Sequence, residues 1–190
     1  MLARAASIAR VHAGAESAIG NALDADSVEA ALSGMGTIVQ LIGTAHPGPS
    51  KADEFVSVDL GSAKAAAQAA GRASVAHSVT HFVHVSVAQP APVMRAYVAA
   101  RAEAERAIRD SGLAATILRP WYVLGPGHWW PLVLVPFHAL ARLIPVTKNT
   151  AERLGLVTLN QMVDALVRAI EDPPLHGEVR IVGVTAIGMG

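Results

Sequence analysis

The sequence predicts an α/β fold in which helices pack against a parallel sheet. Short apolar runs of strand length alternate along the chain with alanine-rich stretches of helical length, which is the pattern of successive βα units. The 190 residues are 52% hydrophobic and 16% charged, so the chain has enough apolar material for one core. A Pro/Gly-rich loop follows a buried strand, where open α/β sheets place ligands. We therefore expect a single domain spanning residues 1–190.

Six apolar runs are expected to form strands. They are residues 15–20, 37–42, 81–86, 115–118, 156–158 and 179–182. The run at 37–42 gives the strongest strand signal because it is rich in apolar side chains and is followed by Gly43. The first residues carry Arg4 and Arg10 among alanines, and we interpret them as the tail of a helix.

Five stretches between these runs are expected to be helical. They are residues 24–33, 60–71, 92–111 and 132–143, and a last helix that ends at residue 170. Asp24 or Asp26 can cap the first of them and Thr158 or Asn160 the last, because their side-chain oxygens can accept from unpaired N–H groups of the first turn. Pro92 is tolerated early in its helix, where its missing N–H costs nothing.

Charge and cysteine content exclude several classes of function. Lys+Arg and Asp+Glu each number 15, so no net field attracts nucleic acid, and we expect no nucleic-acid partner. With no cysteine, the chain forms no disulfide, has no thiolate nucleophile and holds no cysteine-ligated zinc. This composition is compatible with a reducing compartment, and we expect a cytoplasmic protein.

The most apolar window runs from Trp129 to Ile144 and interrupts its apolar residues with prolines, a histidine and an arginine. A membrane-spanning helix needs about 20 apolar residues, so this 16-residue window is too short. We expect a core or lid helix here. The alternative is a surface that contacts a membrane or a protein partner.

Two further motifs do not meet the requirements of the sites they suggest. Gly43 and Gly48 have P-loop spacing, but Pro49 and Ser50 follow where Lys and Ser/Thr are needed, which disfavours an NTPase. His81 and His84 are three residues apart on a predicted strand and so point to opposite faces. We therefore predict no metal site.

A phenol and a guanidinium lie one helical turn apart just before the Pro/Gly-rich loop. Tyr97 and Arg101 occupy positions i and i+4, so their side chains share one face of the predicted helix. The plain alternative is that Tyr97 is a packing residue and that Arg101 pairs with Glu105. Ser86 ends the preceding strand and has its own plain alternative, a hydroxyl bonded to backbone.

Several motifs occur in an order that resembles a known family. They are His81-Phe-Val-His-Val-Ser86, Tyr97-x-x-x-Arg101, Ser111-Gly-Leu113, Thr116-Ile-Leu-Arg-Pro120 and Gly125-Pro-Gly127. Together they resemble the atypical and extended short-chain dehydrogenase/reductases, in particular NmrA-like proteins and a subunit of respiratory complex I with the same fold. The resemblance implies a Rossmann-like, doubly wound parallel sheet with helices on both faces, truncated at the N-terminus. The glycine-rich βαβ opening of the family is absent, and the chain begins roughly 50–60 residues late.

The resemblance also implies a cofactor, NAD or NADP, and roles for particular residues. Tyr97 would be the proton donor, with Arg101 at the place of the lysine that binds the nicotinamide ribose and lowers the phenol pKa. Ser86 would lie near the family's catalytic hydroxyl, which generally falls about two positions later, at Ala88. The implied cofactor-binding residues are those beside the adenine, those whose backbone lines the cofactor and those beside the nicotinamide: Asn21 and Ala22; Ile42, Gly43, Thr44 and Ala45; Pro120 to Val123.

Two hypotheses of different classes emerge. The first is an oxidoreductase or isomerase that uses hydride transfer with Tyr97 as proton donor and acts on a small molecule that the sequence does not identify. The second is a non-catalytic cofactor-sensing protein or assembly subunit with the same fold. It is favoured by three departures from the family pattern, which are Arg101 in place of lysine, Ala88 in place of a hydroxyl and the missing glycine-rich turn.

Overall fold

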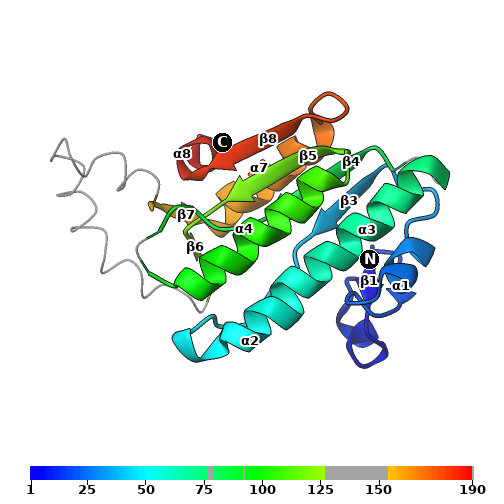
Figure 1. Cartoon of the computed structure of the whole chain (residues 1–190), viewed down its shortest axis with the longest axis horizontal. Helices are drawn as coiled ribbons and strands as arrows, with labels where there is room; N and C mark the ends of the chain where they lie inside the picture. The colour runs from blue at the N-terminus through cyan, green and yellow to red at the C-terminus, as the bar shows by residue number, and fades with distance from the viewer. Residues whose placement is uncertain (77–78, 92, 127–153, 190) are drawn as a thin grey trace, which may run out of the picture.

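The computed structural model describes residues 1–76, 79–91, 93–126 and 154–189 (Figure 1). Its main element is a four-stranded sheet with the order β3-β4-β5-β8, in which every neighbouring pair is parallel. The strands are β3 (Thr37–Gln40), β4 (His81–Val85), β5 (Ala114–Arg119) and β8 (Val179–Gly183). The predicted α/β class with parallel strands is therefore confirmed.

Helices cover both faces of this sheet (Figure 1). On one face lie α3 (Gly61–Ala76) and α4 (Arg95–Asp110), and on the other lies α7 (Leu159–Glu171). Alanines of α3 such as Ala69, Ala70 and Ala73 are fully buried in the same cluster as Phe82 of β4. Because alanine adds little volume, the helix axis can approach the sheet closely, which explains the alanine-rich composition of this stretch.

Two smaller parallel sheets flank the main one. The first pairs β1 (Leu2–Ala3) with β2 (Ala18–Ile19), and the second pairs β6 (Tyr122–Leu124) with β7 (Leu156–Thr158). A 3-10 helix, η1 (Ala5–Arg10), and α1 (Ala25–Ala30) complete the N-terminal region, and α8 (Val184–Gly188) follows β8. The interpretation of the first residues as a helix tail is wrong, since they form a strand followed by a 3-10 turn.

The helix expected to begin at residue 60 is preceded by three further helical segments. They are η2 (Pro49–Lys51), α2 (Ala52–Glu54) and η3 (Phe55–Leu60), of which η3 is a π-helix. A π-helical turn holds one more residue than an α-helical turn and is often found at functional sites. In this protein the turn places Asp59, which is completely buried, against α4.

The remaining boundaries lie close to those predicted. α1 is capped by Asp24 and α7 by Thr158, whose hydroxyl accepts from the backbone N–H of Gln161. α4 begins at Arg95, after Met94 in the left-handed conformation with φ 55°, a few residues later than expected. Pro92 and the expected helix at 132–143 lie outside the described residues.

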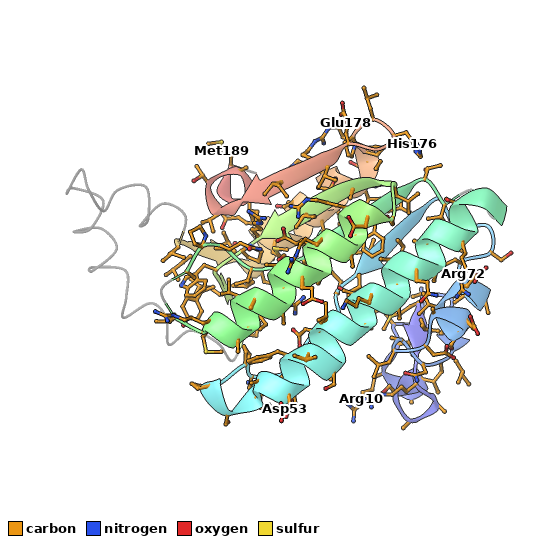
Figure 2. All side chains as sticks on the ribbon, in the orientation of Figure 1. Arg10, Asp53, Arg72, His176, Glu178 and Met189 are labelled. Atoms are coloured by element: carbon orange, nitrogen blue, oxygen red, sulfur yellow. The ribbon has the colours of Figure 1, made fainter. Side chains whose placement is uncertain are left out.

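Charged side chains lie at the periphery of the protein. Figure 2 shows Arg10, Asp53, Arg72 and Glu178 pointing outward from the body of the molecule. Within the described part of the chain, no helix is both long and apolar enough to cross a bilayer.

Candidate functional site

Two contacts with the same spacing join η3 to α4. The rings of Phe55 and Tyr97 are 5.0 Å apart between centroids, and four residues further along each helix Asp59 Oδ1 lies 2.6 Å from Arg101 Nη2. The guanidinium carbon of Arg101 also lies 5.3 Å from the centroid of the Tyr97 ring. The predicted placement of Tyr97 and Arg101 on one face of a helix is confirmed.

Arg101 and Asp59 form a buried ion pair. The Arg101 side chain is 7% exposed and that of Asp59 is fully buried. The geometry of their contact is that of an ion pair without a hydrogen bond. Arg101 Nη1 donates a hydrogen bond of 2.8 Å to the carbonyl of Val85, which connects the guanidinium to the end of β4. The guanidinium is therefore engaged by protein groups on two sides.

Asp59 also fixes the loop that follows β3. Its Oδ2 accepts from the backbone N–H of Thr44 at 2.9 Å and from the Thr44 hydroxyl at 2.5 Å. Gly43 precedes that threonine, and a Cβ on Gly43 would collide with Arg101 Nη2. Arg101 therefore leaves no room for a side chain at Gly43.

A second buried carboxylate, Glu105, lies one turn beyond Arg101 on α4 and is 1% exposed. It accepts hydrogen bonds from four side chains: Ser86 at 2.7 Å, Gln89 at 2.6 Å, Arg119 at 2.9 and 2.6 Å and Arg109 at 3.1 Å. The alternative that Arg101 pairs with Glu105 is wrong, because Arg101 forms its ion pair with Asp59. The Ser86 hydroxyl donates to a carboxylate, so the alternative of a bond to backbone is wrong as well.

The pKa of Glu105 is lowered, whereas that of Tyr97 is raised. Burial opposes ionisation of Glu105, but the hydrogen bonds from Arg119 and Ser86 and the charges of Arg119 and Arg109 outweigh it, so its pKa is lowered. Burial raises the pKa of Tyr97, and Asp59 adds to this increase although Arg101 opposes it. Arg101 therefore lowers the pKa of Tyr97, as expected of a nearby cation, but desolvation is the larger effect and the net pKa is raised.

Tyr97 and Arg101 line a hollow of about 500 Å³ at the carboxyl ends of β4 and β5, which we call the Tyr97 hollow. Its other walls are mostly apolar and aromatic, with one histidine and one serine: Leu41, His46, Pro47, Val85, Ser86, Val87, Met94, Pro120, Trp121, Tyr122 and Val123. The arrangement can hold a flat, largely apolar group against a protonated phenol.

A second hollow, of about 490 Å³, lies beyond the carboxyl ends of β1, β2 and β3, and we call it the Arg4 hollow. Its walls combine apolar residues with two arginines, a serine and an asparagine: Met1, Leu2, Ala3, Arg4, Ser7, Arg10, Gly20, Asn21, Ala22, Leu23, Ile42, Gly43 and Val58. Among these described lining residues there is no Asp or Glu. In the described part of the chain, neither Arg4 nor Arg10 has an ion-pair partner. The hollow therefore has the chemistry of an anion site.

Most of the predicted site residues line one of these two hollows. Asn21, Ala22, Ile42 and Gly43 line the Arg4 hollow, and Ser86, Tyr97, Arg101, Pro120 and Val123 line the Tyr97 hollow. Thr44 and Ala45 line neither, since Thr44 bonds to Asp59 and the Ala45 carbonyl accepts from Lys51 Nζ at 2.7 Å. Gly127, which ends the Pro/Gly-rich loop, and the segment from Trp129 to Ile144 lie outside the described residues.

Sequence reasoning missed Asp59 and the arginines of the Arg4 hollow. Asp59 lies 42 residues before Arg101 in a stretch predicted only to lead into a helix, so nothing in the local pattern indicated the pair. Arg4 directly follows Leu2 and Ala3, an apolar pair that forms β1, and this position at a strand end is the signal that could have identified it. A two-residue strand has too little periodicity for this signal to be recognised.

His81 and His84 bond to different partners, as their predicted opposite orientations require. His81 Nε2 lies 3.1 Å from the Thr116 hydroxyl, and His84 Nδ1 lies 2.9 Å from Gln40 Oε1. The Gln40 amide donates to Ser62 at 2.8 Å, so its oxygen is the group that accepts from His84. Among the described residues, no group of three His, Cys, Asp or Glu side chains could hold a metal ion.

Comparison with known proteins gives a family match over more than half of the chain. Residues 1–126 match the model of a family described as NAD(P)H-binding. A UDP-glucose 4-epimerase of Vibrio cholerae is 31% identical over 96 residues, which are 45% of this chain and 28% of that protein. The chain thus spans less than a third of this relative.

Solved structures show the same fold. A nucleoside-diphosphate-sugar epimerase of Staphylococcus aureus superposes with a TM-score of 0.62 at 17% identity, over 96% of this chain and 60% of that one. A UDP-glucuronic acid 4-epimerase of Bacillus cereus in complex with NAD gives 0.62 at 14% identity, over 92% of this chain and 61% of that one. The predicted Rossmann-like fold is confirmed.

Proposed function

Since the chain belongs to the NAD(P)H-binding family, as an atypical short-chain dehydrogenase/reductase, we propose that it binds NADP(H) across the Arg4 and Tyr97 hollows. The observation that carries the proposal is the basic, acid-free lining of the Arg4 hollow. Gly43 and Ile42 line this hollow, Leu41 lines the Tyr97 hollow, and the three residues are consecutive at the end of β3. A dinucleotide lying over the end of β3 would reach both the Arg4 hollow and the Tyr97 hollow.

The preference for NADP(H) over NAD(H) rests on Arg4. In dinucleotide-binding folds an acidic residue beside the adenosine ribose selects NAD, whereas an arginine accommodates the 2′-phosphate of NADP. Arg4 directly follows β1 and shares the hollow with Arg10 and Ser7. In this proposal Arg4 is the residue that discriminates between the two cofactors.

The residues of the Tyr97 hollow fit the nicotinamide end. The apolar and aromatic walls would hold a flat ring and exclude water, and the cofactor would supply a hydride. Tyr97 would hold the proton, because its raised pKa keeps the phenol protonated at neutral pH. In this proposal the chain is an oxidoreductase or isomerase for a small molecule that reaches Tyr97.

Arg101 would act by positioning Tyr97. Its guanidinium is held by Asp59 and by the Val85 carbonyl, so it would bind the nicotinamide ribose only by giving up a buried partner. The contact with the Tyr97 ring fixes the phenol over the hollow instead. This role differs from that of the family's lysine.

Titration with NADPH and NADH tests the proposal by the quenching of tryptophan fluorescence. We expect NADPH to bind more tightly than NADH, and Arg4→Ala to remove about tenfold or more of the NADPH affinity while leaving NADH binding unchanged. Arg106→Ala is the matched control, because Arg106 is an exposed arginine of α4 that lines neither hollow. Equal affinity for the two cofactors, or an Arg4→Ala variant that binds NADPH as well as the parent, would contradict it.

A non-catalytic role as a cofactor sensor or assembly subunit is the second candidate. It is favoured by the engagement of two candidate groups in structural bonds, with Arg101 paired to Asp59 and Ser86 donating to Glu105. NADPH binding without turnover of quinones or carbonyl compounds would select this candidate over the first.

A further inference from the structure

The loop after β3 brings a histidine to the wall of the Tyr97 hollow. His46 is exposed, and it lines this hollow together with Tyr97 and the aromatic residues Trp121 and Tyr122. In the described part of the chain, neither ring nitrogen of His46 has a hydrogen-bond or ion-pair partner. An imidazole carries at least one N–H in either protonation state, so His46 can always donate a hydrogen bond to a molecule in the hollow.

The backbone at His46 is strained. Its φ of 50° lies in the left-handed region, which residues with a side chain rarely adopt. Among the described residues the only other non-glycine residue with a positive φ is Met94, which lines the same hollow. Such conformations persist only where the surrounding structure enforces them, and they occur preferentially at ligand sites. Glycine would adopt this φ at lower cost, so backbone geometry alone does not account for an imidazole at this position.

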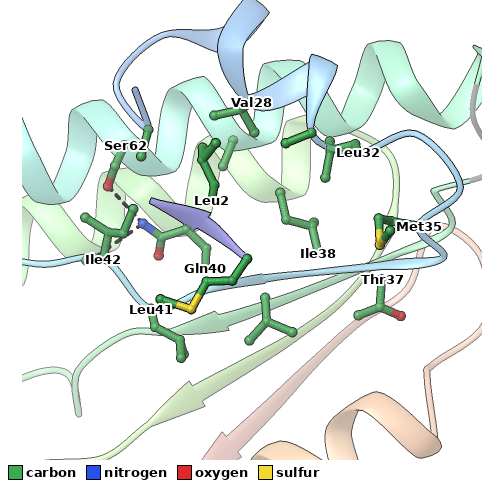
Figure 3. Close-up of a pocket in the computed structure, with 15 residues that line it drawn as sticks. Leu2, Val28, Leu32, Met35, Thr37, Ile38, Gln40, Leu41, Ile42 and Ser62 are labelled. Carbon is green, nitrogen blue, oxygen red and sulfur yellow. Dashed lines mark hydrogen bonds between the residues drawn. The ribbon is translucent and has the colours of Figure 1, made fainter. Parts of the chain in front are cut away.

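Hydrogen bonds fix the end of β3, from which the His46 loop begins. The Gln40 amide donates to Ser62 Oγ at 2.8 Å and to the carbonyl of Ile42 at 3.3 Å (Figure 3). Ser62 belongs to α3, so this contact connects the strand end to the helix that packs on it. The loop therefore leaves the sheet from a fixed point.

The two residues before His46 are held as well. Thr44 donates to the carboxylate of Asp59 through both its backbone N–H and its hydroxyl, and the carbonyl of Ala45 accepts from Lys51 Nζ. A side chain that is held by its surroundings loses less conformational entropy when it binds a ligand. His46 thus differs from a histidine on an unsupported surface loop.

The other polar groups of the hollow already have partners or a proposed task. Ser86 donates to a buried carboxylate, Arg101 is paired with another, and Tyr97 is the proposed proton donor. Tyr97 belongs to α4 and His46 to the loop after β3, and within the described residues no hydrogen bond joins the two side chains. His46 is therefore available for a group of the substrate that Tyr97 does not bind.

We propose that His46 is a substrate-binding residue, which donates a hydrogen bond to a second oxygen of the substrate. This oxygen is distinct from the one that receives the proton of Tyr97, so the inference rests on the proposed function. The described lining of the hollow contains no Asp or Glu that would repel an oxygen acceptor. The substrate is then a flat, largely apolar carbonyl compound that carries an additional oxygen.

The test compares flat ketones that differ only in a second oxygen. The probes are 1-tetralone and its 5-, 6- and 7-hydroxy derivatives, and their dissociation constants for the whole chain are measured by saturation-transfer NMR without nucleotide. We expect the derivative whose oxygen reaches His46 to bind about threefold to tenfold more tightly than 1-tetralone, which corresponds to one hydrogen bond. If none of the three derivatives binds more tightly than 1-tetralone, the proposal is overturned.

Variants at position 46 assign this gain in affinity to the imidazole. Since glycine suits a φ of 50°, His46→Gly should retain the melting temperature of the parent and lose the gain. His46→Asn keeps an N–H donor and tolerates the left-handed conformation, so it should recover part of the gain. His176→Ala changes an exposed histidine that lines neither hollow and should keep all of it. A gain that persists in His46→Gly overturns the assignment.

Turnover with NADPH distinguishes this inference from the proposed function. We expect the wild-type chain to reduce the tighter-binding derivative with a lower KM than 1-tetralone, and His46→Gly to remove that difference. If none of the ketones is reduced, the proposed hydride transfer is contradicted, whereas an NMR gain that His46→Gly abolishes still supports His46 as a binding residue. Reduction with the same KM difference in the wild-type chain and in His46→Gly overturns the role of His46 and leaves the proposed function in place.

Discussion

The carboxylate of Asp59 and the guanidinium of Arg101 meet at 2.6 Å in the interior of the protein, across the contact between η3 and α4. Both side chains are buried, so each depends on the other for compensation of its charge. The pair is connected to the loop after β3 through Thr44 and to the end of β4 through Val85. Its removal should therefore affect stability and the two hollows together.

Asp59→Ala should destabilise the protein by about 3–5 kcal/mol, because it leaves Arg101 buried without a counter-charge. Urea unfolding followed by circular dichroism measures this change. Glu103→Ala is the matched control, since it breaks the solvent-exposed pair between Glu103 and Lys64 and should leave the free energy of unfolding nearly unchanged. Similar costs for the two variants would show that the Asp59–Arg101 pair contributes no more than a surface contact.

Gly43→Ala should destabilise the protein by about 1–3 kcal/mol, because the added methyl group overlaps Arg101 Nη2. Most of this cost should disappear when the same change is made in an Arg101→Ala background, which removes the nearest obstacle and leaves Asp59 Oδ1 at 3.1 Å from the Cβ position. A double-mutant cycle on unfolding free energies measures this coupling. Gly71→Ala, in α3 with open space around its Cβ position, should instead stabilise by about 0.5–1 kcal/mol. An additive cycle would refute the role assigned to Gly43.

Stability should fall as the pH is lowered below about 6.5, in part because of His84. Burial, and after it the charge of Arg101, lowers the pKa of His84 from 6.5 to about 3, against the opposing influence of Glu105 and Gln40. The unfolded chain therefore binds a proton at a higher pH than the folded chain, and folding stability is lost on acidification.

His84→Gln should reduce this pH dependence by up to about 2 kcal/mol between pH 6.5 and 4.5, because glutamine carries no titrating group. The measurement is the unfolding free energy at several pH values, where His81, whose pKa is also lowered by burial, contributes equally to both proteins. His176→Gln, at an exposed position, is the control and should keep the slope of the parent. Parallel pH profiles for the parent and His84→Gln would contradict the prediction.

Tyr97→Phe should abolish NADPH-dependent turnover of carbonyl or quinone substrates, since it removes the proposed proton donor while keeping the ring that packs on Phe55. The melting temperature and the NADPH affinity should stay close to those of the parent. Tyr122→Phe, the same chemical change at the same hollow, should retain turnover. Unchanged turnover in Tyr97→Phe would remove Tyr97 from the mechanism.

The strands of the main sheet and the helices on it could be predicted because their signals are local. The run at 37–42 and the alanines of α3 indicate a buried strand and a closely packed helix by composition alone. The short strands β1 and β6 were missed, although β7, which is as short as β6, was predicted at 156–158, and two or three residues carry little periodicity. Their pairing depends on tertiary contacts.

The candidate site was predictable in place and less so in chemistry. Helical spacing placed Tyr97 and Arg101 together, and the loop after β5 placed Pro120 and Val123 beside them. The partner of Arg101 was not predictable, because the choice between Asp59 and Glu105 is decided by where η3 and Arg119 lie in the fold. The net direction of the Tyr97 pKa shift could not be predicted, since sequence shows the neighbouring cation, which lowers this pKa, and not the extent of burial, which raises it.

The π-helical turn of η3 sets the direction in which Phe55 points relative to the residues of α3. Adding or removing one residue in a helix rotates the residues before that point by about 100° relative to the residues after it. Both contacts with α4 arise within this one turn, so a deletion between Phe55 and Asp59 would separate Phe55 from Tyr97 while Asp59 stays on Arg101. Substitutions at the exposed Val56 leave this direction unchanged. Across variants of this protein, the segment should accept changes of residue type and reject changes of length.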